Sequence, residues 1–227
     1  MRNHADKGSV GGAIWLVTIC LSVVAIASPV LAAGNDSTIR IPKSERAKLA
    51  DLVRREGSDI VVFDDTRFPP LYVFPGPGAG WVEWLSRFHD STLLVQVVAR
   101  SSSPTEDGRW LTTDVRAKVL EVIKETVRDF EVGQTLFIVE DGGELTIEGR
   151  KARAETPWIE PFRVDETYLI FGDGTEKGIT AGDMSAFRLA GDHFSSRKIQ
   201  GPKPNGIEET PAEAILADAR RFGRTGR

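Results

Sequence analysis

The sequence predicts a mainly β protein, built as a small antiparallel β-barrel with a helical segment before it and another after it. Short runs of β-favouring residues follow one another with glycine-containing turns, and no helical crossover separates them. Amphipathic patterns of helical spacing mark the flanking segments. We therefore expect four parts: a leader 1–32, an N-terminal helical and extended arm 33–89, a barrel 90–195, and a linker with a C-terminal helix 196–227.

The segment before the barrel contains two expected helices. Residues 44–56 place apolar side chains on one face at helical spacing, and Gly57 is a natural stop. Residues 81–88 repeat the pattern, which favours packing on a core over a platform for a ligand. The rest of the arm is expected to comprise a flexible start at 34–43, a strand at 59–63 and an extended Pro/Gly-rich stretch at 68–80.

Within the barrel, the strand signals are apolar runs of Val, Ile, Leu, Phe and Thr bounded by Gly, Asp and Ser. The expected strands are 92–99, 135–140, 144–148, 167–171 and 186–189. The expected turns and loops are 101–108, 141–143, 172–174 and 191–192, of which 141–143 starts a return strand.

Residues 110–125 fit two structures. Valines and isoleucines recur at helical spacing, but Val115, Ala117 and Val119 also alternate with charged residues, as in a strand with one buried face. The neighbouring strands favour the strand. In that case the adjacent apolar pair Val119-Leu120 marks a β-bulge or a sharp coil.

The C-terminal segment is expected to form a helix after the polar linker 201–206. Thr210 to Glu213 is a capping box with proline at the first helical position. Three arginines near the end of the chain complement the helix dipole and favour solubility, which we prefer to a site for an anionic ligand; they are Arg220, Arg221 and Arg224.

The beginning of the chain has the pattern of a secretory signal peptide. No charged residue occurs from Gly8 to Asn35, basic residues precede this run, and small residues close it. We expect cleavage between Ala32 and Ala33, and a protein exported to the periplasm or the extracellular space. The alternative is an uncleaved anchor, because the apolar stretch is long enough to span a membrane.

The barrel segment resembles a group of secreted bacterial proteins whose order of elements is similar to the OB-like barrel of netrin modules and tissue inhibitors of metalloproteinases. The resemblance rests on spaced hydrophobic residues and glycines at 113–124, 132–139, 142–143 and 164–171. It implies an OB-like β-barrel and supports the strand at 110–125. The inhibitors' zinc-chelating N-terminal cysteine does not carry over, because the single cysteine, Cys20, lies in the leader.

Composition excludes several classes of function. The chain has 29 Lys and Arg against 33 Asp and Glu, a net charge of −4, which is not the basic excess of a nucleic-acid binder. A chain without cysteine after the leader has no disulfides and no thiolate metal site. His89 and His193 are far apart and show no metal-ligand spacing, so we expect no metal and no cofactor.

No catalytic motif of serine, cysteine or phosphate-binding type occurs. Acidic residues that a carboxylate-dependent hydrolase would need are present, but the sequence does not select a pair among them; examples are Asp64, Asp65, Glu140 and Asp141. Trp110 and Trp158 flank the barrel strands, where they either pack the end of the barrel or stack on a ligand.

The sequence therefore predicts an exported, non-catalytic binding or interaction module. Its partner is an unknown protein, peptide or glycan, with Trp110 and Trp158 as the candidate ligand-binding residues. Two alternatives stay open: a carboxylate-dependent hydrolase, and an envelope structural protein tethered to the membrane by its leader.

Overall fold

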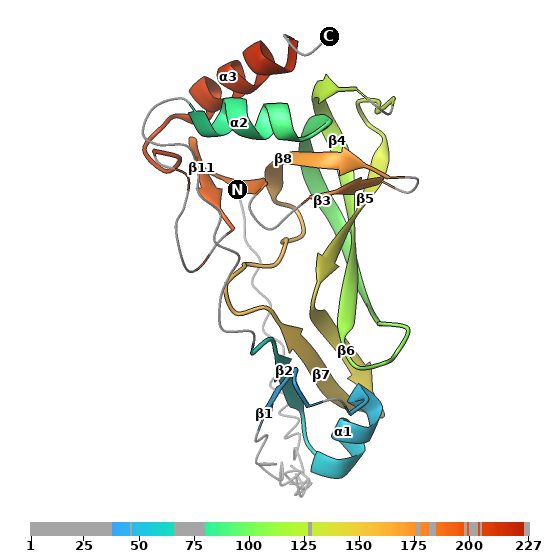
Figure 1. The fold of residues 1–227 in the computed structure, drawn as a ribbon. Helices are drawn as coiled ribbons and strands as arrows, with labels where there is room; N and C mark the ends of the chain where they lie inside the picture. The colour runs from blue at the N-terminus through green and yellow to red at the C-terminus, as the bar shows by residue number, and fades with distance from the viewer. Residues whose placement is uncertain are drawn as a thin grey trace, which may run out of the picture. The chain divides into compact units, whose positions relative to one another are not determined.

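A computed structural model describes residues 38–45, 47–65, 80–126, 129–175, 178–181, 185–197, 199, 204 and 206–224. In these ranges the chain is mainly β, with two mixed sheets and three helices (Figure 1). The predicted class, mainly β with flanking helices, is confirmed, but the expected purely antiparallel pairing is wrong, because both sheets also contain parallel pairs. The expected leader with its cleavage site at Ala32 and Ala33 lies outside the described residues, and so does nearly all of the Pro/Gly-rich stretch.

The larger sheet has seven strands in the order β11-β10-β8-β3-β4-β5-β9, and β9 also pairs with β8. Five of the strands, β3, β4, β5, β9 and β8, therefore form a closed circuit of pairings. Neighbours in this sheet are antiparallel except β5 and β9, which are parallel. The strands are β3 (Ser91–Pro104), β4 (Leu111–Glu125), β5 (Thr135–Asp141), β8 (Thr167–Gly174), β9 (Gly178–Thr180), β10 (Ala186–Ala190) and β11 (His193–Ser196).

Closure of this circuit requires a close approach of β9 to β5. A Cβ atom added at Gly178 would lie 2.0 Å from the carbonyl oxygen of Phe137, far inside van der Waals contact. Only glycine fits there. The interior of the circuit is apolar, and side chains such as Leu93, Val115 and Ile170 are fully buried in it.

Strand β4 settles the ambiguity at 110–125. Its side chains alternate between buried and exposed from Thr113 to Leu120, as the strand interpretation predicts. The pairing with β3 shifts by one residue at Leu120, because Val119 pairs with Val95 whereas Glu121 pairs with Leu94. The predicted bulge at Val119-Leu120 is confirmed.

The smaller sheet has four strands in the order β1-β2-β7-β6. The two pairings that involve β2 are parallel, and β6 with β7 is an antiparallel hairpin. Helix α1 (Leu49–Glu56) packs Leu49, Leu52 and Val53 against this sheet. The strands are β1 (Ile39–Pro42), β2 (Ile60–Phe63), β6 (Gly143–Ile147) and β7 (Arg150–Glu155).

Some expected boundaries are wrong. Residues 39–42 form β1 in place of a flexible start, α1 begins at Leu49, and β3 runs through the first half of the expected loop 101–108. Residues 172–174, expected as a turn, belong to β8, because they pair with β3 and β9. β7, β9 and β11 were not predicted, since their runs are short or charged.

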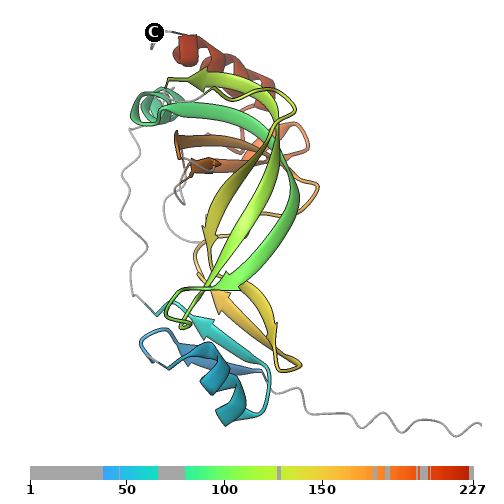
Figure 2. The ribbon, with the colours of Figure 1, turned by 90° about the vertical axis from the view of Figure 1, so that its right-hand side faces the viewer.

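The expected turn at 141–143 does not return the chain onto β5. β6 pairs with β7, and the hairpin turn lies at Glu148-Gly149. Gly142 and Gly143 instead carry the chain from one sheet to the other, with φ angles of 92° and 142° that favour glycine. The long strands β3 and β4 run alongside each other to β6 (Figure 2).

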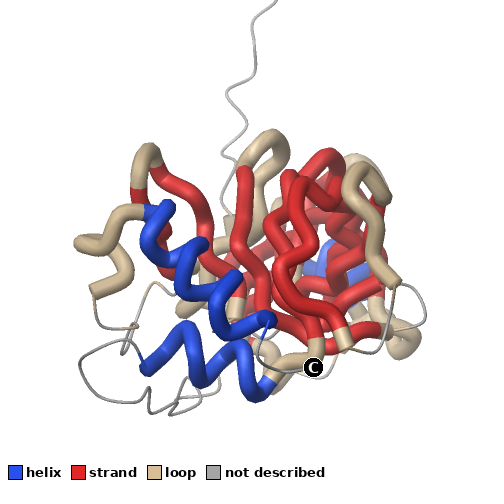
Figure 3. The backbone as a smooth tube through the Cα atoms, turned by 90° about the horizontal axis from the view of Figure 1, so that it is seen from above, coloured by secondary structure: helices blue, strands red, loops and turns tan. Residues whose placement is uncertain are grey.

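Two helices cover one end of the seven-stranded sheet. Helix α2 (Gly80–Phe88) and helix α3 (Ala212–Arg224) lie side by side (Figure 3) and share an apolar core with β8, β10 and β11. Arg220 of α3 forms two hydrogen bonds to Glu121 of β4, at 2.7 and 2.8 Å. One of the three C-terminal arginines therefore fastens α3 to the sheet, besides complementing the helix dipole.

Candidate binding pocket

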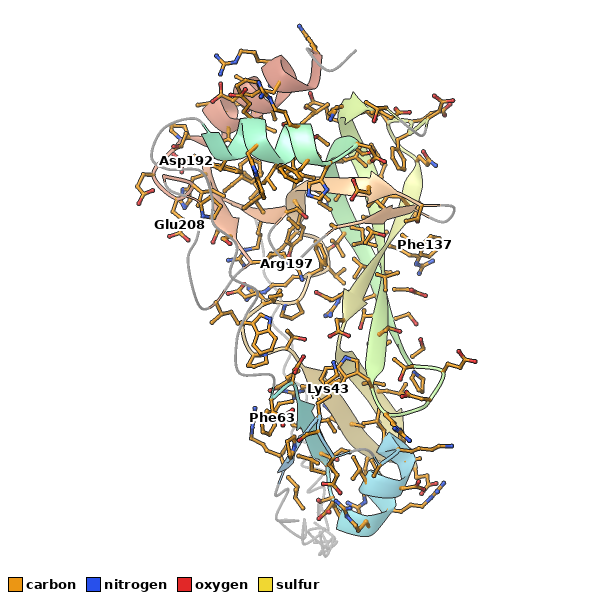
Figure 4. All side chains as sticks on the ribbon, viewed as in Figure 1. Lys43, Phe63, Phe137, Asp192, Arg197 and Glu208 are labelled. Carbon is orange, nitrogen blue, oxygen red and sulfur yellow. The ribbon has the colours of Figure 1, made fainter. Side chains whose placement is uncertain are left out.

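A pocket of about 880 Å³ is lined by residues of both sheets. Its walls come from β3, β5, β6 and β7, and from the segment 156–162 that follows β7. The size suits a small organic ligand or a few residues of a polymer. Arg197 lies on the side of the seven-stranded sheet and Lys43 on the side of the four-stranded sheet (Figure 4).

The segment 156–162 is fixed by hydrogen bonds to its surroundings. The Glu160 amide donates to the Arg197 carbonyl at 2.7 Å, and the Ile199 amide donates to the Trp158 carbonyl at 2.8 Å. The Phe162 amide donates to Oε1 of Glu140 at 2.9 Å. These bonds hold the half-buried Trp158 and the buried Phe162 in the pocket wall.

Glu140 is the centre of a buried ionic cluster in this wall. Its side chain is only 8% exposed, and its two oxygens accept from different guanidinium groups. Oε1 accepts from Arg197, and Oε2 accepts from Arg100 at 2.7 Å. Arg197 is 4% exposed, its Nε donates to the Glu160 carbonyl at 2.8 Å, and its guanidinium lies 3.6 Å from the Phe162 ring centroid. Burial of these charges is tolerated because each is paired.

Arg100 makes fewer hydrogen bonds to its surroundings than Glu140 does. Its side chain is 29% exposed and lines the pocket. Its Nε is buried and has no hydrogen-bond partner among the described residues, and the same is true of the Thr156 hydroxyl, also in the pocket wall. The wall therefore holds both a donor and a hydroxyl with unused hydrogen-bonding capacity.

The other carboxylates of the pocket are ion-paired at its rim. Lys43 lies 3.5 Å from Asp64 and 3.9 Å from Asp141. Each of the remaining two has two basic partners: Glu144 contacts Lys151 and Arg153, and Glu155 contacts Arg40 and Arg153. These pairs are partly exposed, so each contributes little to stability.

The two tryptophans predicted as ligand-binding candidates lie in different places. Trp158 lines the pocket. Trp110 is 5% exposed and packs in the core of the four-stranded sheet, where its indole N–H donates to Asp141 Oδ1 at 2.7 Å and Lys43 lies 4.2 Å from its ring. Trp110 therefore packs in the core of the four-stranded sheet, and its hydrogen bond supports Asp141, which lines the pocket.

The acidic residues that the sequence left unselected are partly brought together. Asp64, Glu140 and Asp141 line the same pocket. Asp65 does not, and it accepts hydrogen bonds from the Ser44 hydroxyl at 2.6 Å and the Ser44 amide at 3.2 Å. The hydroxyl bond is the main reason why the pKa of Asp65 is lowered.

Sequence reasoning missed the two arginines of the pocket wall. Arg100 ends an apolar run, and Arg197 follows two serines in a polar stretch, so neither stands in a recognisable motif. Arginine in such contexts is ordinarily a solvated surface residue. Their shared partner, Glu140, is distant from both in sequence, and only the fold brings the three together.

A second polar cluster lies at the C-terminal end of α2. Lys124 of β4 is 9% exposed, and its ammonium donates to the carbonyl oxygens of Ser86 and His89. Burial lowers the pKa of Lys124. Both bonds go to carbonyls at the helix terminus, so Lys124 caps α2.

The described residues contain no group of three or more His, Cys, Asp or Glu that would hold a metal ion. His89 and His193 each face one aspartate. No helix in the described part of the chain has the length and apolar character needed to cross a membrane. No family model matches the chain, and no curated protein matches it.

Proposed function

We propose that the protein is an exported, non-catalytic binding module whose ligand lies in the pocket between the two sheets. The uncharged leader pattern from Gly8 to Asn35 supports export to the periplasm or the extracellular space. The acidic net charge argues against a nucleic acid as the partner. The partner is then a protein, a peptide or a glycan.

The proposal includes an OB-like barrel as the scaffold. Its support is the order of pairings in the circuit of five strands. β3, β4 and β5 form an antiparallel meander, β9 runs parallel to β5, and β8 pairs with both β9 and β3. An OB-like barrel has five strands that close in this manner and binds ligands at one face and its loops.

The pocket itself carries the functional proposal. It combines an aromatic side chain, Trp158, with hydrogen-bond donors and acceptors in its lining. Ligand sites have this composition, an apolar wall with a few polar groups that fix orientation. A fold alone does not define a function, so the proposal rests on these residues.

Binding of small oligosaccharides and short peptides to the full chain tests the proposal. We expect at least one compound of such a panel to bind by ligand-observed NMR, and Trp158→Ala to weaken its binding at least tenfold. Trp84→Ala, a partly buried tryptophan on α2 outside the pocket, is the matched control and leaves binding unchanged. Binding of no compound, or binding insensitive to Trp158→Ala, overturns the proposal for these ligands.

One observation favours a second function, a carboxylate-dependent hydrolase. Asp64, Glu140 and Asp141 line one pocket, and glycoside hydrolysis requires a pair of carboxyl groups. Against this, Glu140 already accepts three hydrogen bonds. Lys43 forms ion pairs with both Asp64 and Asp141. Turnover of chromogenic glycosides that is lost in an Asp64→Asn variant shown to be folded by thermal unfolding would establish the hydrolase, and we expect no turnover.

A further inference from the structure

Arg100 has more hydrogen-bond donors than its surroundings use. A guanidinium carries five N–H groups. Nη2 of Arg100 donates to Oε2 of Glu140. The buried Nε of Arg100 has no hydrogen-bond partner among the described residues. This Nε is closed to solvent, so a ligand in the pocket meets the exposed part of the Arg100 side chain, which lines the pocket.

Glu140 accepts only part of the hydrogen bonds that the guanidinium of Arg100 can donate. A carboxylate binds arginine best with two parallel hydrogen bonds. Here Oε1 of Glu140 serves Arg197 and the Phe162 amide, so that a single oxygen is left for Arg100. The planar fork of Arg100, 29% exposed on the pocket wall, is therefore still available for a second planar acceptor.

The rest of the pocket restricts the charge of that acceptor. Five carboxylates and three arginines line the pocket, so its lining is net negative and repels a highly charged anion; the carboxylates are Asp64, Glu140, Asp141, Glu144 and Glu155. A doubly charged phosphate would meet about twice the repulsion of a singly charged group. A planar, singly charged carboxylate matches the fork and minimises the repulsion.

The apolar part of the wall indicates that this carboxylate is carried on an organic body. Trp158, Phe162 and two prolines line the same pocket as Arg100. We propose that the pocket binds a ligand through its carboxylate, which Arg100 holds, while Trp158 and its apolar neighbours contact the rest. This inference rests on the proposed function, and it names the ligand chemistry of the same pocket.

Matched pairs of probes test the inference and distinguish two sources of a carboxylate. Glucuronate and glucuronamide represent an acidic sugar, and N-acetyl-dialanine and its amide represent a peptide C-terminus. We expect the full chain to bind the acid of at least one pair about tenfold or more tightly than the amide. The pair that shows this preference identifies the source.

Variants then assign the preference to one side chain. Arg100→Gln is expected to lose the acid-over-amide preference. Arg116→Gln makes the same change of charge at an exposed position on β4 outside the pocket and is expected to keep it. Thermal unfolding checks that both variants are folded, and if Arg100→Gln is not, the acid and amide comparison on the unchanged chain decides.

The failures are distinguishable. Equal binding of acid and amide overturns the carboxylate inference and leaves the binding module standing, because a neutral ligand still occupies the pocket. A preference that survives in folded Arg100→Gln overturns the assignment to Arg100. Binding of none of the four probes overturns the inference for both sources, whereas the Trp158→Ala experiment tests the pocket with other ligands.

Discussion

The closed circuit of strands and the four-stranded sheet are assembled from the chain in different ways. In the circuit, β3, β4 and β5 follow one another and pair as a meander around a fully buried apolar interior. In the four-stranded sheet, β1 and β2 come from residues 39–63, whereas β6 and β7 come from residues 143–155. Its strands also carry exposed ion pairs, such as Arg153 with Glu144. The four-stranded sheet should therefore depend on the long-range pairing of β2 with β7 in addition to its own apolar core.

The largest effect is expected where the pocket wall meets the circuit. Glu140→Gln removes the buried charge between Arg100 and Arg197 and leaves two arginines without that counter-charge. We expect a loss of about 3–5 kcal/mol in the free energy of unfolding, measured by urea denaturation. Glu144→Gln, at a 44% exposed carboxylate with two basic partners, is the control and should cost less than about 1 kcal/mol. Similar losses in both would contradict the view that burial decides.

Truncation of one core residue in each region sharpens the comparison. Ile170→Ala in the circuit and Leu52→Ala in α1 each leave a cavity and should cost about 2–5 kcal/mol. Hydrogen exchange distinguishes the regions. We expect Leu52→Ala to increase exchange in β1 and β2 first, and Ile170→Ala to increase it throughout. An equal increase everywhere in both variants would mean that the two sheets unfold as one unit.

Substitution of two glycines with similar φ angles tests whether the connection between β5 and β6 requires glycine. Gly142 (φ 92°) and Gly149 (φ 79°) both adopt left-handed conformations, but a Cβ at Gly142 would lie 2.6 Å from the Ala154 carbonyl, and a Cβ at Gly149 would contact nothing. Gly149→Ala should cost about 1–2 kcal/mol from the backbone angle alone. Gly142→Ala should cost more, and thermal unfolding of the pair checks the difference. Equal costs would show that the close approach relaxes easily.

The smallest effect is expected at the bond between α3 and β4, and it depends on pH. The hydrogen bond from Arg220 is the main reason why the pKa of Glu121 is lowered. A lowered carboxyl pKa stabilises the fold above the unfolded-state pKa, and the contribution is lost as pH falls through the folded-state value. We expect Glu121→Gln to cost about 1 kcal/mol or less at pH 7, since both groups are about one-third exposed, and to cost less as the pH is lowered toward 2. A difference that stays the same from pH 7 to pH 2 would contradict this.

The two regions also differ in how far the sequence predicts them. In the circuit, β3, β5 and β8 are apolar runs and β4 alternates apolar with charged residues, so their class and even the bulge at Leu120 follow from local pattern. The three-residue β9 has too short a run to be predicted. β7, with the sequence Arg-Lys-Ala-Arg-Ala-Glu, has no such pattern, because its strand character comes from its pairing with β2. Local periodicity does not encode a partner that lies so far away in the sequence.

The candidate site was predictable only in part for the same reason. Trp158 could be selected because a loop tryptophan beside a strand is conspicuous. Glu140 was one of many acidic residues, and its importance depends on the arginines that two separate segments bring to it. Charged residues become a site through their arrangement in space, and neither Arg100 nor Arg197 carries a local signal of that arrangement.

The parallel pairing of β2 with β7 has a consequence for the newly made chain. Ile60 pairs with Ala152, so β2 is synthesised about ninety residues before its partner. Chains are made from the N-terminus, and during this interval the apolar run Ile60–Phe63 has an unpaired edge that promotes association between chains. A holding chaperone that covers this edge until β7 has been made would therefore raise the yield of folded protein.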